Sequence, residues 1–213
     1  AYWLPVDRPD LARDLDLWLS ERERDGALTA IRTRELGTDS LPPTATPLPS
    51  LLAAIDERLA LMPFVAEVKR QTGAAVEVPA VERRVIAAAL GGVEEAAGAL
   101  GAEPPADARV EALFRAQIEA AKSLQHEQLS RPADPDLARF DLASDLRPAL
   151  IRIGERISRI VVRLHGAGGD AADLEHVRAR VARRLAAREL GDPSLDAISR
   201  AIVDLAGSNP DDA

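Results

Sequence analysis

The segment VEALFRAQIEAAKSLQ, residues 110–125, constrains the fold most strongly because it predicts one long helix whose inward face is apolar except for two amides. The residues that recur at helical spacing are Val110, Leu113, Phe114, Gln117, Ile118, Ala121, Leu124 and Gln125. Gln117 and Gln125 are eight residues apart and so lie nearly in line along the helix axis. A buried amide without a hydrogen-bond partner costs about 1–3 kcal/mol. We therefore expect a neighbouring helix or a ligand to supply that partner.

The composition predicts an all-α protein and argues against several kinds of site. The 213 residues are rich in Ala, Leu, Arg and Glu, and only 3% are aromatic. Cysteine is absent and the three histidines are scattered, so we expect no disulfide and no metal site. A net charge of −8 argues against a nucleic-acid partner. No apolar run approaches the ~18 residues of a membrane span, so we expect no membrane partner.

The chain divides into parts of unequal length. AYWLPV is typical of a short strand, and residues 9–36 predict a helical hairpin or an interrupted helix broken at Gly26. The segment that follows contains Pro42, Pro43, Pro47 and Pro49, which are typical of an extended linker. We expect a strand-plus-helix leader over 1–37, a linker over 38–49, a multi-helix domain over 50–208 and a tail over 209–213.

Periodic apolar residues predict six helices after the linker. Pro63 falls inside the first of them and predicts a kink, whereas Pro79 is a favourable first-turn residue for the second. The expected helices cover about 50–72, 79–100, 106–130, 141–164, 171–189 and 193–206.

Several charged residues on these helices are candidates for a binding site. Arg58 and Lys69 are eleven residues apart, or about 16 Å along one helix, and point the same way. Two long basic side chains at that spacing can converge on a small dianion, or they can remain solvated surface charges. Arg147, Glu82 and Arg84 are equally ambiguous when each is taken alone.

Taken together, four segments resemble a known family. ERLALMPFVAEVK, VEVPAVERRVI, VEALFRAQIEAAKSLQ and DLRPAL occur in the order found in the exported, all-helical class of chorismate mutases. The resemblance extends from about Pro49 to Ala206. It implies a cofactor-free Claisen rearrangement of chorismate to prephenate, which needs no nucleophile and no metal.

The resemblance also implies a role for each matching residue. Arg58 and Arg147 would bind the two carboxylates of chorismate, since arginine pairs with a carboxylate through two parallel hydrogen bonds. Lys69 and Gln125 would flank the ether oxygen of the breaking bond, and Glu82 would hydrogen-bond the ring hydroxyl and position the lysine. Catalysis would rest on holding the reactive conformer and on donors directed at the developing charge. Gln117 has no counterpart in this set and is interpreted as structural.

Three positions depart from the family pattern. Val81 stands where the family has an arginine, Val78 where it has an aspartate, and Ala121 where it has an asparagine. Losing one preorganised donor costs about 3–4 kcal/mol, a factor of roughly 10²–10³ in rate. Arg84 lies one turn beyond Val81 on nearly the same face. Our hypothesis is that Arg84 partly replaces the missing cation.

The leader carries a second resemblance. Residues 1–37 are similar to the end of periplasmic solute-binding-protein folds, which cyclohexadienyl dehydratases also use. This implies a remnant of a fused dehydratase domain and a periplasmic or secreted location. Some 35 residues cannot form a two-lobed domain, so no dehydratase activity is expected from them.

Two classes of function remain open at this point. The first is a chorismate mutase, weakened by the three departures. The second is a catalytically degenerate mutase domain that serves as an assembly or regulatory module of a fused dehydratase. Isochorismate–pyruvate lyases use a similar scaffold, but the longer exported-type architecture argues against that activity. The resemblance is compatible with a homodimer and with a site completed within one chain.

Overall fold

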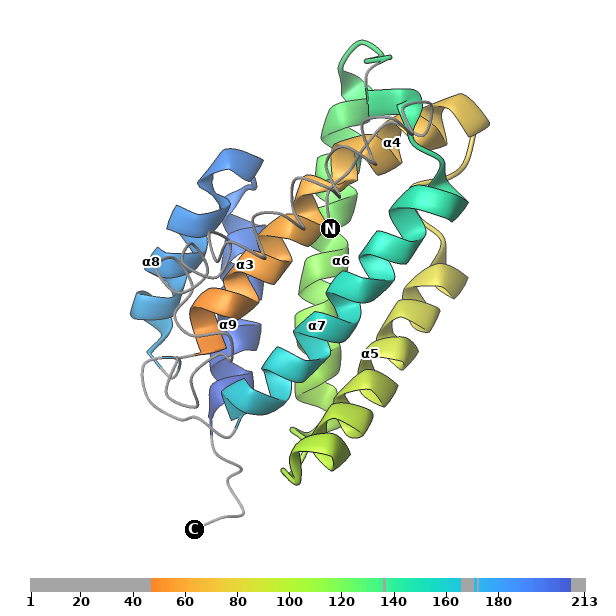
Figure 1. Ribbon diagram of the computed structural model, residues 1–213. Coiled ribbons are helices and arrows are strands. Elements are labelled where there is room, and N and C mark those ends of the chain that lie inside the picture. The colour runs from red at the N-terminus through yellow and green to blue at the C-terminus, as the bar shows by residue number, and fades with distance from the viewer. Residues whose placement is uncertain (1–46, 136, 166–170, 172, 208–213) are drawn as a thin grey trace, which may run out of the picture. The chain divides into compact units, whose positions relative to one another are not determined.

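The computed structural model describes residues 47–135, 137–165, 171 and 173–207, and every regular element within them is helical (Figure 1). The elements are α3 (Pro47–Ala60), α4 (Met62–Thr72), α5 (Pro79–Leu100), α6 (Asp107–Ser130), the 3₁₀ turn η1 (Leu137–Arg139), the π-helical η2 (Leu142–Leu146), α7 (Arg147–His165), α8 (Leu174–Leu185), the 3₁₀ turn η4 (Ala186–Arg188) and α9 (Asp192–Ala206). The predicted all-α class is therefore confirmed. The chain divides at Ala45 into two units, and the predicted leader, the predicted tail and most of the linker lie outside the described residues.

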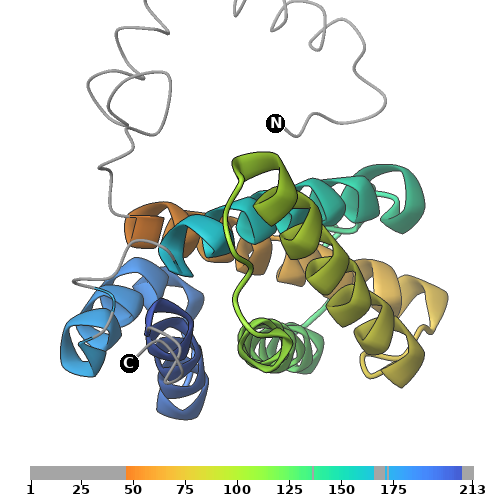
Figure 2. The same ribbon diagram turned by 90° about the horizontal axis from the view of Figure 1, so that it is seen from below.

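Helix α6 is the centre of the bundle. Figure 2 shows it nearly end-on in green, with the blue helices α8 and α9 to its left and the yellow-green α5 above and to its right. It packs against α4, α5 and α9 and also contacts α3, while α7 packs against α3 and α5. Phe114 and Leu113 of α6 are among the largest fully buried side chains. The segment that the sequence singled out is thus the core helix.

Three prolines explain where the first helices begin and bend. The predicted kink near Pro63 is confirmed, because α3 ends at Ala60 and α4 begins at Met62 with Pro63 in its first turn. The intervening Leu61 keeps helical dihedral angles, φ −81° and ψ −10°. Helix α3 begins at Pro47, so three residues expected in the linker are helical; Pro47 and Pro49 lie in its first turn, where a missing N–H costs no intrahelical bond.

Helices α5 and α7 approach each other closely where Gly92 faces Ser158. A Cβ built on Gly92 of α5 would lie 3.1 Å from the Ser158 Oγ of α7. The Ser158 hydroxyl in turn donates to the Ala89 carbonyl at 3.4 Å. The glycine therefore allows α7 to pack closely on α5. None of the described helices combines the length and apolarity that a membrane crossing requires.

Candidate active site

Arg58 lies in the last turn of α3 and is buried, with 8% of its surface exposed. Its Nε atom has no hydrogen-bond partner among the described residues. Burial lowers the pKa of Arg58 to about 10, so the side chain remains a cation at neutral pH. A buried, incompletely paired cation is unfavourable unless an anion reaches it. Arg58 is therefore suited to bind an anionic group.

Lys69 lies in the last turn of α4 and is only partly exposed. Its Nζ atom donates to the Val76 carbonyl, at 3.1 Å, in the segment between α4 and α5. Burial lowers the pKa of Lys69, and the charge of Glu82 opposes that shift in part. The ammonium is thus held near Glu82 by the backbone that leads into α5.

Glu82 lies in the first turn of α5, next to the exposed Val81. Proline at the start of this helix and the extended Val78 before it set the position of the turn. A carboxylate near a helix N-terminus is stabilised by the helix dipole. Glu82 Oε1 lies 3.6 Å from the Nζ atom of Lys122 on α6. Glu82 therefore connects α5 electrostatically to both α4 and α6.

Gln125 and Gln117 are both buried on α6, with 5% and 0% exposure. Each donates to the carbonyl one turn back, Gln125 to Ala121 at 3.2 Å and Gln117 to Leu113 at 3.4 Å. The Oε1 atom of each is unpartnered among the described residues. Gln125 Nε2 also lies 3.5 Å from the Met62 sulfur of α4. Because a thioether is a weak acceptor, a better acceptor can take that N–H.

Arg147 is the first residue of α7 and is exposed. The chain enters α7 through the π-helical η2, in which the Arg147 N–H bonds to the Leu142 carbonyl. Asp141 caps this turn by accepting from the backbone N–H groups of Ala143 and Ser144, at 2.8 and 2.7 Å. These bonds lower the pKa of Asp141, and the charge of Arg147 contributes to that shift. The sequence predicted a helix over this segment but not its π-helical start.

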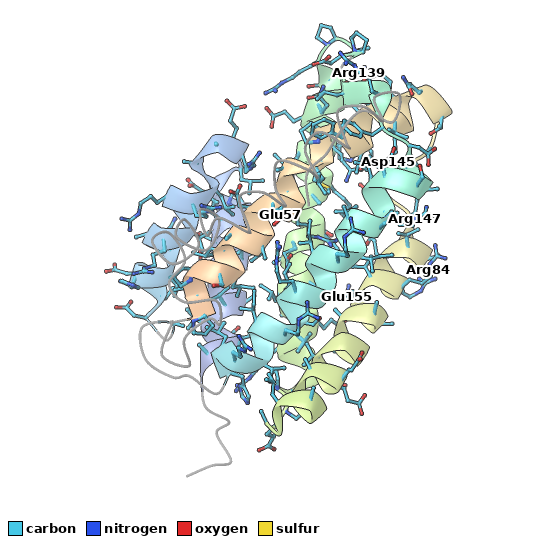
Figure 3. The ribbon with its side chains drawn as sticks, in the orientation of Figure 1. Glu57, Arg84, Arg139, Asp145, Arg147 and Glu155 are labelled. Carbon is cyan, nitrogen blue, oxygen red and sulfur yellow. The ribbon has the colours of Figure 1, made fainter. Side chains whose placement is uncertain are left out.

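The structure brings some of the sequence-predicted residues together. Lys69 and Glu82 are coupled by charge, and Gln125 meets the first residue of α4. No hydrogen bond or ion pair joins Arg58 or Arg147 to that group within the described part of the chain. Arg84 is exposed on α5, and Figure 3 shows it together with Arg147 at the start of α7.

Sequence reasoning missed Lys122. It directly follows Ala121 in the same segment of α6, and its side chain is 16% exposed. The feature of the sequence that could have indicated Lys122 is its position, one helical turn before Gln125. The helix that carries both residues, α6, also packs against α5. The described residues contain no cluster of three side chains suited to hold a metal ion.

Part of the chain is similar to a known protein family. Residues 50–126, which carry Arg58, Lys69, Glu82 and Gln125, match the family model described as chorismate mutase type II. Over these residues the chain is similar to chorismate mutase type II domains. The match ends before Arg147 and so does not include α7.

Two solved structures are similar to the chain. The secreted chorismate mutase from Yersinia pestis is 23% identical, with a TM-score of 0.59, and the alignment covers 71% of this chain and 94% of that one. The chorismate mutase from Burkholderia thailandensis is 26% identical, with a TM-score of 0.51 and coverage of 75% and 99%. No curated protein matches the chain. The alignments therefore span nearly the whole of both neighbours.

Proposed function

We propose that the protein is a chorismate mutase that converts chorismate to prephenate without a cofactor. The observation that carries the proposal is the buried Arg58, whose Nε lacks a partner among the described residues, in a domain of this family. The family match and the structural neighbours support this isomerase activity.

Each predicted side chain has a task in this proposal. Arg58 and Arg147 bind the two carboxylates of chorismate. Lys69 and Gln125 donate to the ether oxygen as negative charge develops on it. Glu82 accepts from the ring hydroxyl and orients Lys69. The rearrangement is unimolecular, so the residues bind the reactive conformer and stabilise charge but form no covalent bond.

The departures at the start of α5 and on α6 predict weak rather than full activity. Val81 is 42% exposed and supplies no donor, and Val78 and Ala121 carry no polar side chain. Arg84, the cation proposed to compensate, lies one turn further along the helix. An Arg84→Ala variant tests this: a loss of turnover supports compensation, and unchanged turnover rejects it.

The decisive experiment is to follow the loss of chorismate absorbance with the purified protein and to identify the product. Formation of prephenate supports the proposal. In a separate assay with isochorismate as the substrate, pyruvate with salicylate would indicate lyase chemistry. Absence of any turnover would favour the second function, an assembly or regulatory module of a fused dehydratase. Val81, exposed where the family has an arginine, is the observation that favours this second function.

The proposal extends to the domain boundaries, the cellular location and the oligomeric state of the protein. We assign residues 1–37 to a dehydratase remnant, 38–49 to the linker and 50–208 to the mutase domain. We also propose an exported protein, periplasmic or secreted, because one similar structure is a secreted chorismate mutase. The product would then feed phenylalanine biosynthesis. Sedimentation of the purified protein distinguishes a homodimer from a monomer.

A further inference from the structure

Lys122 points from the middle of α6 toward α5 rather than into solvent. Its side chain is 16% exposed, whereas that of its helix neighbour Glu119 is 65% exposed. Its Nζ atom lies 2.6 Å from Glu119 Oε1 and 3.6 Å from Glu82 Oε1. The hydrogen bond to Glu119 and the charges of Glu119, Glu82 and Glu77 raise the pKa of Lys122. A second ammonium group is therefore present at the start of α5, where Val81 supplies none.

The charge of Glu82 acts on two ammonium groups, but Glu82 forms an ion pair with only one of them. It forms an ion pair with Lys122, whereas it acts on Lys69 through its charge alone. Among the described residues no carboxylate forms an ion pair with Lys69, which donates a hydrogen bond to the Val76 carbonyl. An ammonium has three N–H donors, so two of those on Lys69 remain for a ligand.

We propose that Lys122 is a positioning residue that acts through Glu82. It holds the Glu82 carboxylate toward α6 and so keeps Lys69 free of a direct ion pair. Only the step from a free Lys69 donor to faster turnover rests on the proposed function.

An ordinary surface pair with Glu119 is the alternative role for Lys122. Pairs spaced by three residues on a helix contribute about 0.2–0.5 kcal/mol and do not affect a distant site. Glu119→Gln removes that pair and leaves the contact with Glu82, so it is the matched control. Lys122→Arg keeps the charge and is the conservative variant, whereas Lys122→Met removes it.

The first experiment measures the titration of Lys69 by NMR with ¹³C-labelled lysine. Glu82 on α5 acts on Lys69, while Glu82, Glu119 on α6 and Glu77 between α4 and α5 act on Lys122, and His126 on α6 lies against Glu77. In the Lys122→Met variant the pKa of Lys69 rises, because Glu82 is released to pair with it. When Glu82→Gln is also present, Lys122→Met can raise the pKa of Lys69 only by removing the direct repulsion between the two lysines. An equal rise in both backgrounds overturns the proposal.

The second experiment measures turnover of chorismate by the same variants. Lys122→Met lowers kcat roughly 10²-fold, the cost of misplacing a reacting group by about 1 Å, with a smaller change in KM. Lys122→Arg restores most of the rate, Glu119→Gln has no effect, and Lys122→Met causes little further loss in the Glu82→Gln background. Equal fold losses in both backgrounds overturn the proposal. A wild-type protein without turnover contradicts the proposed function, while the titration still decides the role of Lys122.

Discussion

Gln125 donates its side-chain N–H to the carbonyl of Ala121, 3.2 Å away and one turn back on α6. The side chain of Ala121 offers no hydrogen-bonding group, so the amide of Gln125 satisfies one donor within its own helix. Its remaining N–H is directed at the Met62 sulfur, and its oxygen has no partner among the described residues. The buried amide is therefore only partly satisfied, and a ligand oxygen would improve its bonding.

Replacing Gln125 with leucine is expected to reduce kcat by roughly 10²–10³-fold, because a donor to the developing charge is lost. Gln117→Leu is the matched control, since Gln117 is equally buried and makes the same bond one turn back. It should leave kcat unchanged. Steady-state kinetics of the two variants checks the prediction, and equal losses in both would assign Gln125 a purely structural role.

Arg58→Met is expected to abolish turnover without lowering the free energy of unfolding. A buried charge that lacks a full set of partners contributes little stability, and an apolar replacement of similar size is often neutral or stabilising by about 1–4 kcal/mol. Chorismate turnover is measured directly, and thermal unfolding with and without chorismate reports stability and ligand binding. The ligand-induced rise in Tm should disappear in the variant. Arg156→Met, which breaks an ion pair with Glu57 on the surface, is the control and should retain that rise. A marked fall in the ligand-free Tm of Arg58→Met would contradict this account.

The sequence predicted the fold well because long apolar stripes and prolines determine these helices. The helix expected over 79–100 is the observed α5, and the one expected over 106–130 differs from α6 by a single residue. The helix expected over 171–189 is divided, since α8 ends at Leu185 and a 3₁₀ turn continues the chain to a left-handed Glu189, φ 55°. Neither the apolar periodicity nor the composition of this segment predicts where the α-helix ends and the 3₁₀ turn begins.

The candidate site could be predicted only in part. Spacing along one helix brought Arg58 and Lys69 to attention, and both prove to be at least partly buried. Lys122 was missed because its partner Glu82 is 40 residues away in sequence, and only the packing of α5 on α6 brings the two together. The π-helical start of α7 depends on the Asp141 cap, and no pattern in the sequence distinguishes it from an α-helical start.

Glu67→Gln is expected to destabilise the protein at neutral pH. Glu67 is 1% exposed and accepts hydrogen bonds from Gln128 at 2.8 Å and from Arg70 at 3.0 Å. Burial alone would raise its pKa, but these bonds and one from the Asp134 backbone outweigh burial and leave the pKa lowered. A lowered pKa stabilises the fold above the ordinary glutamate range, and this contribution is lost as the pH falls through the lowered value.

Urea unfolding of wild type and Glu67→Gln across the acid range checks this prediction. The difference in unfolding free energy should be about 1–3 kcal/mol at neutral pH and should shrink in acid, where the wild-type carboxyl is protonated. Glu127→Gln on the exposed side of the same region is the control. A difference that stays constant with pH would show that the charge of Glu67 does not contribute.

Val81→Arg is expected to raise kcat/KM by about tenfold or more. Val81 is 42% exposed in the first turn of α5, so there is room for a guanidinium group beside Glu82. A cation near a helix N-terminus costs about 0.3–1 kcal/mol, which is smaller than the roughly 3 kcal/mol that one preorganised donor supplies to catalysis. Val81→Gln, which adds length without charge, is the control. Equal kinetics for the two variants would show that positive charge at this position is not what the site lacks.

Turnover is expected to decline on the alkaline side at a pH below the ordinary lysine value of 10.5. Burial lowers the pKa of Lys69, so the ammonium donor is lost as the pH rises through that lowered value. Glu82 raises the pKa of Lys69, so Glu82→Gln should move the decline to still lower pH. Lys69→Arg should move it to higher pH, toward the value of about 10 at which Arg58 titrates. The pH dependence of kcat/KM for the three proteins measures these shifts, and a decline at the same pH in all of them would exclude Lys69 as the titrating group.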